Sequence, residues 1–398
     1  MRLSIRRVLS ALAIAMIVSS GILNAQRTET RLSSRGRELL AEARSQGRAT
    51  VTLLVATSTG STSAVATALQ GLGGTIRYQD DQLGYVRVVI PTAQVEAAAA
   101  LNGVNAVDLD EVIPVYDPRP QAEEVVQVDP PGPLTPGLNP YMPTRDIGAP
   151  QFVEANPTYD GRGVKIGIVD LGVDVLTPEL QTARLLTGAS APKIIDWVTF
   201  TDPLTDNDPT WINMAQEVSG AVFTAGGAAY TAPAKGSYRF GLFNERDPRL
   251  GGEVGNDVNR DGNPAGSSGL FAVLWHTSTN TVWVDANQNR NFADDLPMRD
   301  FKINRDVGRF GTDNPATAVR ESMPFVVQTN GQEKFVNIGI VSGAHGTHVA
   351  GIAAGKDFFG GAFDGVAPEV QIVSVRACLF VAGCTSHALL EGMSAGAQ

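Results

Sequence analysis

A run of small residues around two histidines, Ala344 to Gly355, constrains this chain more than any other stretch. The pattern predicts a helix that begins at His345, in which Gly346, Ala350 and Gly351 leave room for another backbone or a ligand. In α/β proteins the catalytic groups gather where a strand ends and a helix begins. A histidine at that place can act as a general base near neutral pH, provided that a carboxylate orients it and a nucleophile lies beside it.

The best candidate for the carboxylate lies upstream, at Asp170. Residues Val164 to Val169 are apolar and rich in β-branched side chains, which predicts a buried strand with Asp170 at its carboxyl end. Gly172 allows the chain to turn sharply just beyond it. Aspartate is also favoured in helix caps and turns, so a purely structural role for Asp170 is the alternative interpretation.

The two blocks together resemble those of the subtilisin-like serine peptidases, which carry an aspartate after such a strand and then a His-Gly-Thr-His-Val-Ala-Gly helix. The resemblance implies an α/β fold with a parallel sheet and helices on both faces. It also implies that Asp170 holds the Nδ1 proton of His345, that Nε2 faces a serine, and that His348 supports the fold. Leu171 departs from the family, which has Ser or Thr there. A metal pair at His345 and His348 is a rival interpretation, but the Glu of the zinc-peptidase pattern is missing.

No residue of the chain is assigned as the nucleophile. The family places its serine far downstream of the histidine, in a Gly-Thr-Ser-Met-Ala sequence. Ser394 stands in a superficially similar setting, but the residues before it read as the interior of a helix. We therefore expect the chain to be the N-terminal part of a longer secreted serine endopeptidase, with a non-catalytic subtilisin-like binding or inhibitory protein as the alternative.

Composition and the N-terminus indicate an exported protein. The net charge of −10 argues against a nucleic-acid partner. Residues 1–25 have the positive start, apolar stretch and small-residue end of a secretory signal, so we expect a secreted protein, extracellular or periplasmic, with no membrane association after its removal. A membrane anchor is the alternative, but the apolar stretch is short for a span.

Four segments follow the predicted signal. They are a polar helix or linker at 26–48, a domain at 49–116, a proline-rich linker at 117–145 and the N-terminal part of the peptidase domain at 146–398. The second segment has a β-α-β-β-α-β pattern, which predicts a small α+β domain of the ferredoxin-like, split βαβ type. Its place resembles that of subtilisin propeptides, which implies a zymogen whose own propeptide is an intramolecular inhibitor. An ordinary accessory domain is the alternative.

The interval between Asp170 and His345 is long for the family, and we expect a β-rich insert at about 197–335. Its strands are predicted at Ser237–Asn244 and in a hairpin of Leu270–His276 with Thr281–Asp285. The insert resembles that of the tripeptidyl-peptidase II branch. Aligning that branch without a gap places Ser386 where it has a glutamate for the substrate's ammonium group, so we expect an endopeptidase acting on proteins or peptides, with a tripeptidyl aminopeptidase as the alternative.

Two loops of the insert are rich in oxygen atoms and are candidates for structural calcium, while no cofactor is expected for catalysis. The candidate ligands are Asp257, Asn259 and Asp261 in the first loop, and Asp285, Asn287 and Asn289 in the second. The first loop has Ser268 where a calcium loop has its bidentate Glu. Asp and Asn are also ordinary turn formers, which is the alternative. Cys378 and Cys384 could form a disulfide in an oxidising compartment or remain buried thiols.

Overall fold

The computed structural model describes residues 31–114, 142, 144, 146–316 and 320–397, in two compact units divided between Asp110 and Glu111. The predicted signal at 1–25 and nearly all of the predicted linker at 117–145 lie outside the described residues. None of the helices in the described ranges combines the length and the apolar character that crossing a bilayer requires.

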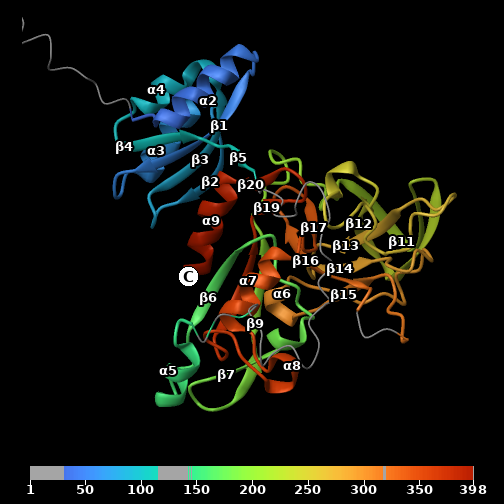
Figure 1. Ribbon diagram of the computed structural model, residues 1–398. Coiled ribbons are helices and arrows are strands. Elements are labelled where there is room, and N and C mark those ends of the chain that lie inside the picture. The colour runs from blue at the N-terminus through green and yellow to red at the C-terminus, as the bar shows by residue number, and fades with distance from the viewer. Residues whose placement is uncertain (1–30, 115–141, 143, 145, 317–319, 398) are drawn as a thin grey trace, which may run out of the picture. The chain divides into compact units, whose positions relative to one another are not determined.

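The N-terminal unit is a four-stranded antiparallel sheet with helices (Figure 1). Its elements are α2 (Ser34–Ser45), β1 (Thr50–Thr57), α3 (Thr62–Gly71), β2 (Thr75–Asp80), β3 (Tyr85–Pro91), η1 (Thr92–Gln94), α4 (Val95–Ala99) and β4 (Val104–Leu109). The predicted order of strands and helices is confirmed, and the sheet order β2-β3-β1-β4 is that of a split βαβ domain. Its core holds Leu53 and Val55 of β1, alternate side chains of β3 (Val86, Val88) and Leu69 of α3.

The C-terminal unit is built on a three-stranded parallel sheet, in the order β6-β18-β9. The strands are β6 (Lys165–Asp170), β9 (Ile194–Thr199) and β18 (Gln371–Arg376). The predicted parallel sheet and a strand that ends at Asp170 are therefore confirmed, but Ile168 is the one buried residue of β6, so the prediction of a buried strand is wrong. β9 runs past position 197, where we expected the insert to begin, so the insert starts after the strand.

Helices pack on both faces of this sheet, because successive side chains of a strand point to opposite sides. Ala350 and Ala354 of α7 (His345–Ala354) share a buried cluster with Ile168 and Ile372. On the other face, Val169 and Val375 lie next to Gly392 of α9 (Ser386–Ala397). Both helices lie where the sequence predicted them.

The insert consists of two antiparallel four-stranded sheets, ordered β10-β17-β16-β15 and β11-β12-β13-β14 (Figure 1, where most of it is yellow to orange). The strands are β10 (Trp211–Asn213), β11 (Gln216–Ala225), β12 (Ala228–Asn244), β13 (Leu270–His276), β14 (Thr281–Val284), β15 (Gly308–Phe310), β16 (Met323–Asn330) and β17 (Phe335–Gly339). The predicted hairpin is confirmed as β13 and β14. Phe271 and Phe310 bring the two sheets together around one core, with ring centroids 4.7 Å apart.

The remaining elements of this unit are short. They are β5 (Val112–Ile113), α5 (Ala149–Ala155), η3 (Pro178–Leu180), β7 (Thr182–Arg184), β8 (Ser190–Pro192), η4 (Pro248–Leu250), α6 (Phe301–Asn304), α8 (Phe358–Gly361), β19 (Cys378–Leu379) and β20 (Gly383–Thr385). A disulfide joins Cys378 to Cys384 across the β19–β20 pair.

Candidate active site

Asp170 and His345 meet at the carboxyl edge of the parallel sheet, although 175 residues separate them in the chain. The Nδ1 atom of His345 lies 2.8 Å from Oδ2 of Asp170 and 3.0 Å from Oδ1. The backbone N–H of Leu171 donates to Oδ1 of Asp170 at 2.7 Å. The carboxylate is therefore held on both sides, and it orients the imidazole through one ring nitrogen.

A close approach of two backbones makes this pairing possible. A Cβ atom on Gly346 would lie 2.4 Å from the carbonyl oxygen of Gly172, so only glycine fits at the first turn of α7. Gly172 itself has φ of +94°, which glycine adopts without the penalty that a Cβ brings. These two glycines allow the loop after β6 to pass directly beneath the start of the helix.

Hydrogen bonds from three other elements fix the loop after Asp170. The backbone N–H of Val173 donates to Oγ of Ser374 on β18, and the indole Nε1 of Trp197 on β9 donates to the carbonyl of Val173. The backbone N–H of Asp174 donates to Oγ1 of Thr347 on α7. Leu171 departs from the family pattern, but it contacts the carboxylate of Asp170 mainly through its backbone. Its side chain therefore does not displace the carboxylate.

The other ring nitrogen of His345 is available for chemistry. The His345 side chain is 62% exposed, whereas that of Asp170 is 14% exposed. Within the part of the chain that the structure describes, Nε2 of His345 has no hydrogen-bond partner. A histidine oriented at Nδ1 and open at Nε2 has the arrangement of a general base in acyl transfer.

Glu253 is a further acidic residue at the site, and the sequence patterns did not single it out. Its Oε2 accepts a hydrogen bond of 2.7 Å from the backbone N–H of Ala344, directly before His345. A Cβ atom on Gly343 would also touch its carboxyl group, at 3.3 Å. Glu253 is exposed and comes from a loop of the insert. No local motif marks it, because only the fold brings this loop to the start of α7.

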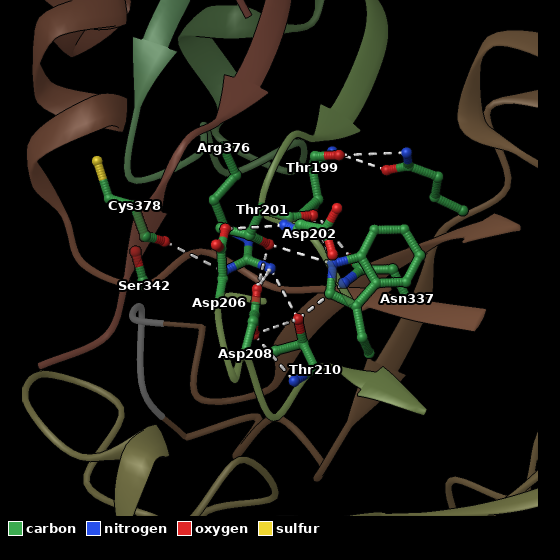
Figure 2. A network of polar contacts seen from close by, with 12 residues as sticks. Thr199, Thr201, Asp202, Asp206, Asp208, Thr210, Asn337, Ser342, Arg376 and Cys378 are labelled. Carbon is green, nitrogen blue, oxygen red and sulfur yellow. Dashed lines mark hydrogen bonds and ion pairs between the residues drawn. The ribbon is translucent and has the colours of Figure 1, made fainter. Parts of the chain in front are cut away.

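A buried polar network supports the edge of the sheet on which Asp170 lies (Figure 2). Arg376 is the last residue of β18 and pairs in register with Asp170. Its NH2 atom donates to Oδ2 of Asp208 and to Oγ1 of Thr210, each at 2.7 Å, and the Arg376 and Asp208 side chains are fully buried. Nδ2 of Asn337 on β17 donates to Oγ1 of Thr210 at 2.8 Å. The network therefore joins the parallel sheet to the insert.

The charge of Asp208 is maintained by its partners. Burial by itself would raise the pKa of this carboxyl, but Arg376, with the hydroxyls of Thr201 and Thr210, holds it below its ordinary value. Asp208 is therefore ionised at neutral pH and forms a buried ion pair with Arg376.

The C-terminal end of α7 is also anchored to the parallel sheet by hydrogen bonds. The ammonium group of Lys193, next to β9, donates to the carbonyl of Ala354 at 2.8 Å and to that of Pro368. Burial lowers the pKa of Lys193 to about 8. A donor at the last carbonyls of a helix satisfies groups that have no partner within the helix.

Other residues from the sequence patterns lie away from the pair. The side chain of His348 is exposed on α7, so it does not pack in the core. The prediction that this side chain supports the fold is wrong. Ser394 lies within α9, where the residues before it are helical and make no sharp turn. The candidate calcium ligands lie in two loops of the insert, at 257–261 and after β14.

The fold is a parallel α/β sheet with an Asp–His pair at its carboxyl edge. The sequence profile of the subtilase family matches residues 161–395, more than half of the chain. The chain belongs to the subtilase family. A second profile, described as "Putative peptidase inhibitor domain", matches residues 24–110.

Curated relatives match the chain at low identity. Pyrolysin of Pyrococcus furiosus is 25% identical over 411 residues, which cover 88% of this chain and 27% of the relative. Tripeptidyl-peptidase 2 of Arabidopsis thaliana is 26% identical over 306 residues, covering 59% of this chain and 21% of the relative. A crystal structure of tripeptidyl peptidase 2 is 19% identical, with a TM-score of 0.43, over 61% of this chain and 23% of that one. The chain thus spans about a quarter of the length of the curated relatives it matches.

Proposed function

We propose that the protein is a secreted serine endopeptidase, made as a zymogen, in which Asp170 and His345 are the acid and base of the catalytic triad. The observation that carries the proposal is the 2.8 Å contact of His345 Nδ1 with Asp170, together with the exposure of the imidazole. Membership of a peptidase family supports it.

The chemistry follows from the two ring nitrogens. Nε2 of His345 would take the proton of a serine hydroxyl as the oxygen attacks the peptide carbonyl, and would then give it to the departing amine. Asp170 would stabilise the imidazolium and keep the proton on Nδ1. The resulting ester is hydrolysed by water in the same way. We propose that the serine belongs to sequence beyond these 398 residues, which would complete the site in the whole protein.

A tripeptidyl aminopeptidase is the second candidate, and Glu253 is the observation in its favour. An exposed carboxylate beside the start of α7 could bind the ammonium group of a substrate. The residues considered from the sequence are less suited to that role. Ser386 has no charge and donates to the carbonyl of Glu111, while Glu391 is buried in α9.

A pair of peptides tests the kind of cleavage. The complete protein is given one peptide of about ten residues in free-amine and N-acetylated forms, and the products are identified by mass spectrometry. We expect internal cleavage of both forms at similar kcat/KM, because an endopeptidase does not require the ammonium group. Loss of cleavage on acetylation, with tripeptides from the free form, would establish the aminopeptidase, and cleavage of neither would favour a non-catalytic binding protein.

Export is a further part of the proposal. The signal-like pattern at 1–25 supports it, and so does the Cys378–Cys384 disulfide, since such bonds persist in oxidising compartments. We propose an extracellular or periplasmic location. An antibody against the chain should detect it in the medium or periplasm, and retention of the protein in the cytosol would contradict this location.

We further propose that the N-terminal unit is a propeptide that inhibits the enzyme and is then removed. Its match to an inhibitor profile and its compact, separate core support this role. We expect the mature protein to begin within residues 111–145, because prolines and charges make such a segment accessible to proteolysis. N-terminal sequencing of the active protein measures the start, and a mature chain that still begins near Gln26 would contradict the propeptide role.

A further inference from the structure

Glu253 places a carboxylate beside His345, and the endopeptidase mechanism gives it no role. Its side chain is exposed, and its Oε2 accepts a hydrogen bond of 2.7 Å from the backbone N–H of Ala344. Consecutive Cα atoms are about 3.8 Å apart, so this carboxylate lies close to the backbone of the next residue, His345. Among the residues that the structure describes, Oε1 of Glu253 accepts no hydrogen bond. One oxygen of the carboxylate is therefore available to a ligand.

The charge of Glu253 is not balanced within the described part of the chain, where it forms no ion pair. The positive side chains that precede it in the same loop are engaged elsewhere. The guanidinium of Arg246 donates to Oδ1 of Asn263 at 2.7 Å. That of Arg249 forms an ion pair with Asp247. A cationic group of a bound molecule would therefore meet no competing side chain from this loop.

The loop that carries Glu253 is fixed by contacts on either side of it. Val254 is buried in the core that the two sheets of the insert share. A Cβ atom on Gly252, whose φ is +68°, would lie 2.9 Å from the carbonyl oxygen of Phe380, in the turn between β19 and β20. The loop therefore passes directly against this turn. Contacts of this kind hold Glu253 in place, and a residue that selects substrates needs such support.

An apolar side chain lies next to the available oxygen. A Cβ atom on Gly343 would be 3.1 Å from Cδ1 of Leu171 and 3.3 Å from Oε1 of Glu253, so the two side chains cover the same glycine. Leu171 is half-buried and directly follows Asp170. An apolar surface beside an unpaired carboxylate suits a side chain with an apolar stem and a positive head.

We propose that Leu171 and Glu253 form a subsite for a Lys or Arg side chain of the substrate. The methylene stem packs on Leu171, and the cationic group pairs with Oε1 of Glu253. An extended peptide advances about 3.3 Å per residue, so the side chain belongs to a residue within about two positions of the cleaved bond. The subsite rests on the proposed endopeptidase activity, and it makes Glu253 the partner of a side chain rather than of a terminal ammonium group.

Peptides with blocked N-termini test the subsite in the complete protein. An N-acetylated peptide with one internal cleavage site is prepared with Lys, Leu or Glu at each of the two positions on either side of the cleaved bond. Mass spectrometry of the products gives kcat and KM. At one position we expect kcat/KM for Lys to exceed that for Leu about fivefold, the size of effect that an exposed ion pair produces. Glu at the same position should fall below Leu.

Glu253→Gln separates the binding of a cation from support of the helix. The amide oxygen can still accept from the N–H of Ala344, but the charge is lost. We expect the ratio of kcat/KM for Lys to that for Leu to fall to about one. A residue that only supports the start of α7 would change kcat for every peptide alike and leave this ratio as it was. Glu217→Gln, which changes an exposed carboxylate on β11, is the matched control and should keep the parental ratio.

Two results would overturn the subsite and leave the endopeptidase in place: a parental ratio near one at all four positions, or a ratio that persists in Glu253→Gln. Should that variant fail to fold, Glu253→Ala takes its place and should lose the same ratio. Added salt should also reduce the preference for Lys, because an exposed pair is screened. Cleavage of free-amine peptides alone, or of none, would overturn the proposed function and the subsite with it.

Discussion

Replacing Asp170 by asparagine should lower the kcat of the complete protein by about 10⁴-fold, with the fold intact. An asparagine amide can donate to Nδ1 of His345 and would then leave the proton on Nε2, which is the wrong tautomer for a base. The carboxylate contacts the imidazole at 2.8 Å and receives the N–H of Leu171, so the isosteric amide keeps the packing. Steady-state kinetics on a chromogenic peptide measures kcat and KM separately, and we expect KM to change little.

Asp174→Asn is the matched control for this prediction. Asp174 stands in the same loop, but its carboxylate binds Arg320 and the N–H of Leu176 rather than His345. We expect its kcat to stay within a few-fold of the parent. His345→Ala should match the loss seen for Asp170→Asn or exceed it. If Asp170→Asn lost less than about tenfold in kcat, or melted far below the parent, Asp170 would not be the residue that orients the base.

Removing the charge of Arg376 should destabilise the C-terminal unit by about 3–5 kcal/mol, the cost of leaving a buried charge without its partner. In Arg376→Met the carboxylate of Asp208 would remain buried with the hydroxyls of Thr201 and Thr210 and the backbone N–H of Thr210 but no positive charge. Urea unfolding at pH 7 measures the free energy of this unit. The exposed pair of Arg239 with Glu217 provides the control, and Arg239→Met should cost about 1 kcal/mol or less.

The pH dependence of this pair has a defined sign. The pKa of Asp208 is lower in the folded protein than its ordinary value. Its contribution to stability is therefore present at pH values above the ordinary pKa, and it is lost as the pH falls through the lowered pKa. Arg376→Met should remove this part of the acid sensitivity. Adding Asp208→Asn to it should recover part of the loss, because no charge is then left unpaired. A cost below about 1 kcal/mol for Arg376→Met would show that water reaches Asp208 and replaces the guanidinium.

Some strands of the insert were not predicted from the sequence. They show where the local pattern of apolar and polar residues no longer indicates a strand. β13 was predicted because Leu270 to His276 is a continuous apolar run, five residues of which are buried. β11 alternates weakly, and most of its residues are exposed or half-buried, so its pattern resembles a polar loop. It becomes a strand because it pairs along the length of β12, which is a contact between segments and not a local preference.

The sequence by itself determined the two elements that present Asp170 and His345, because their signals are local. The apolar run before Asp170 specifies a strand, and the small residues after His345 specify a helix that packs closely on it. Tertiary structure alone decided which distant groups meet them: the carboxylate of Glu253 at the start of α7 and the Arg376–Asp208 pair beneath the sheet edge. Each of these joins residues far apart in the chain through single polar contacts, which have no sequence period and form only when the backbone has already brought them together.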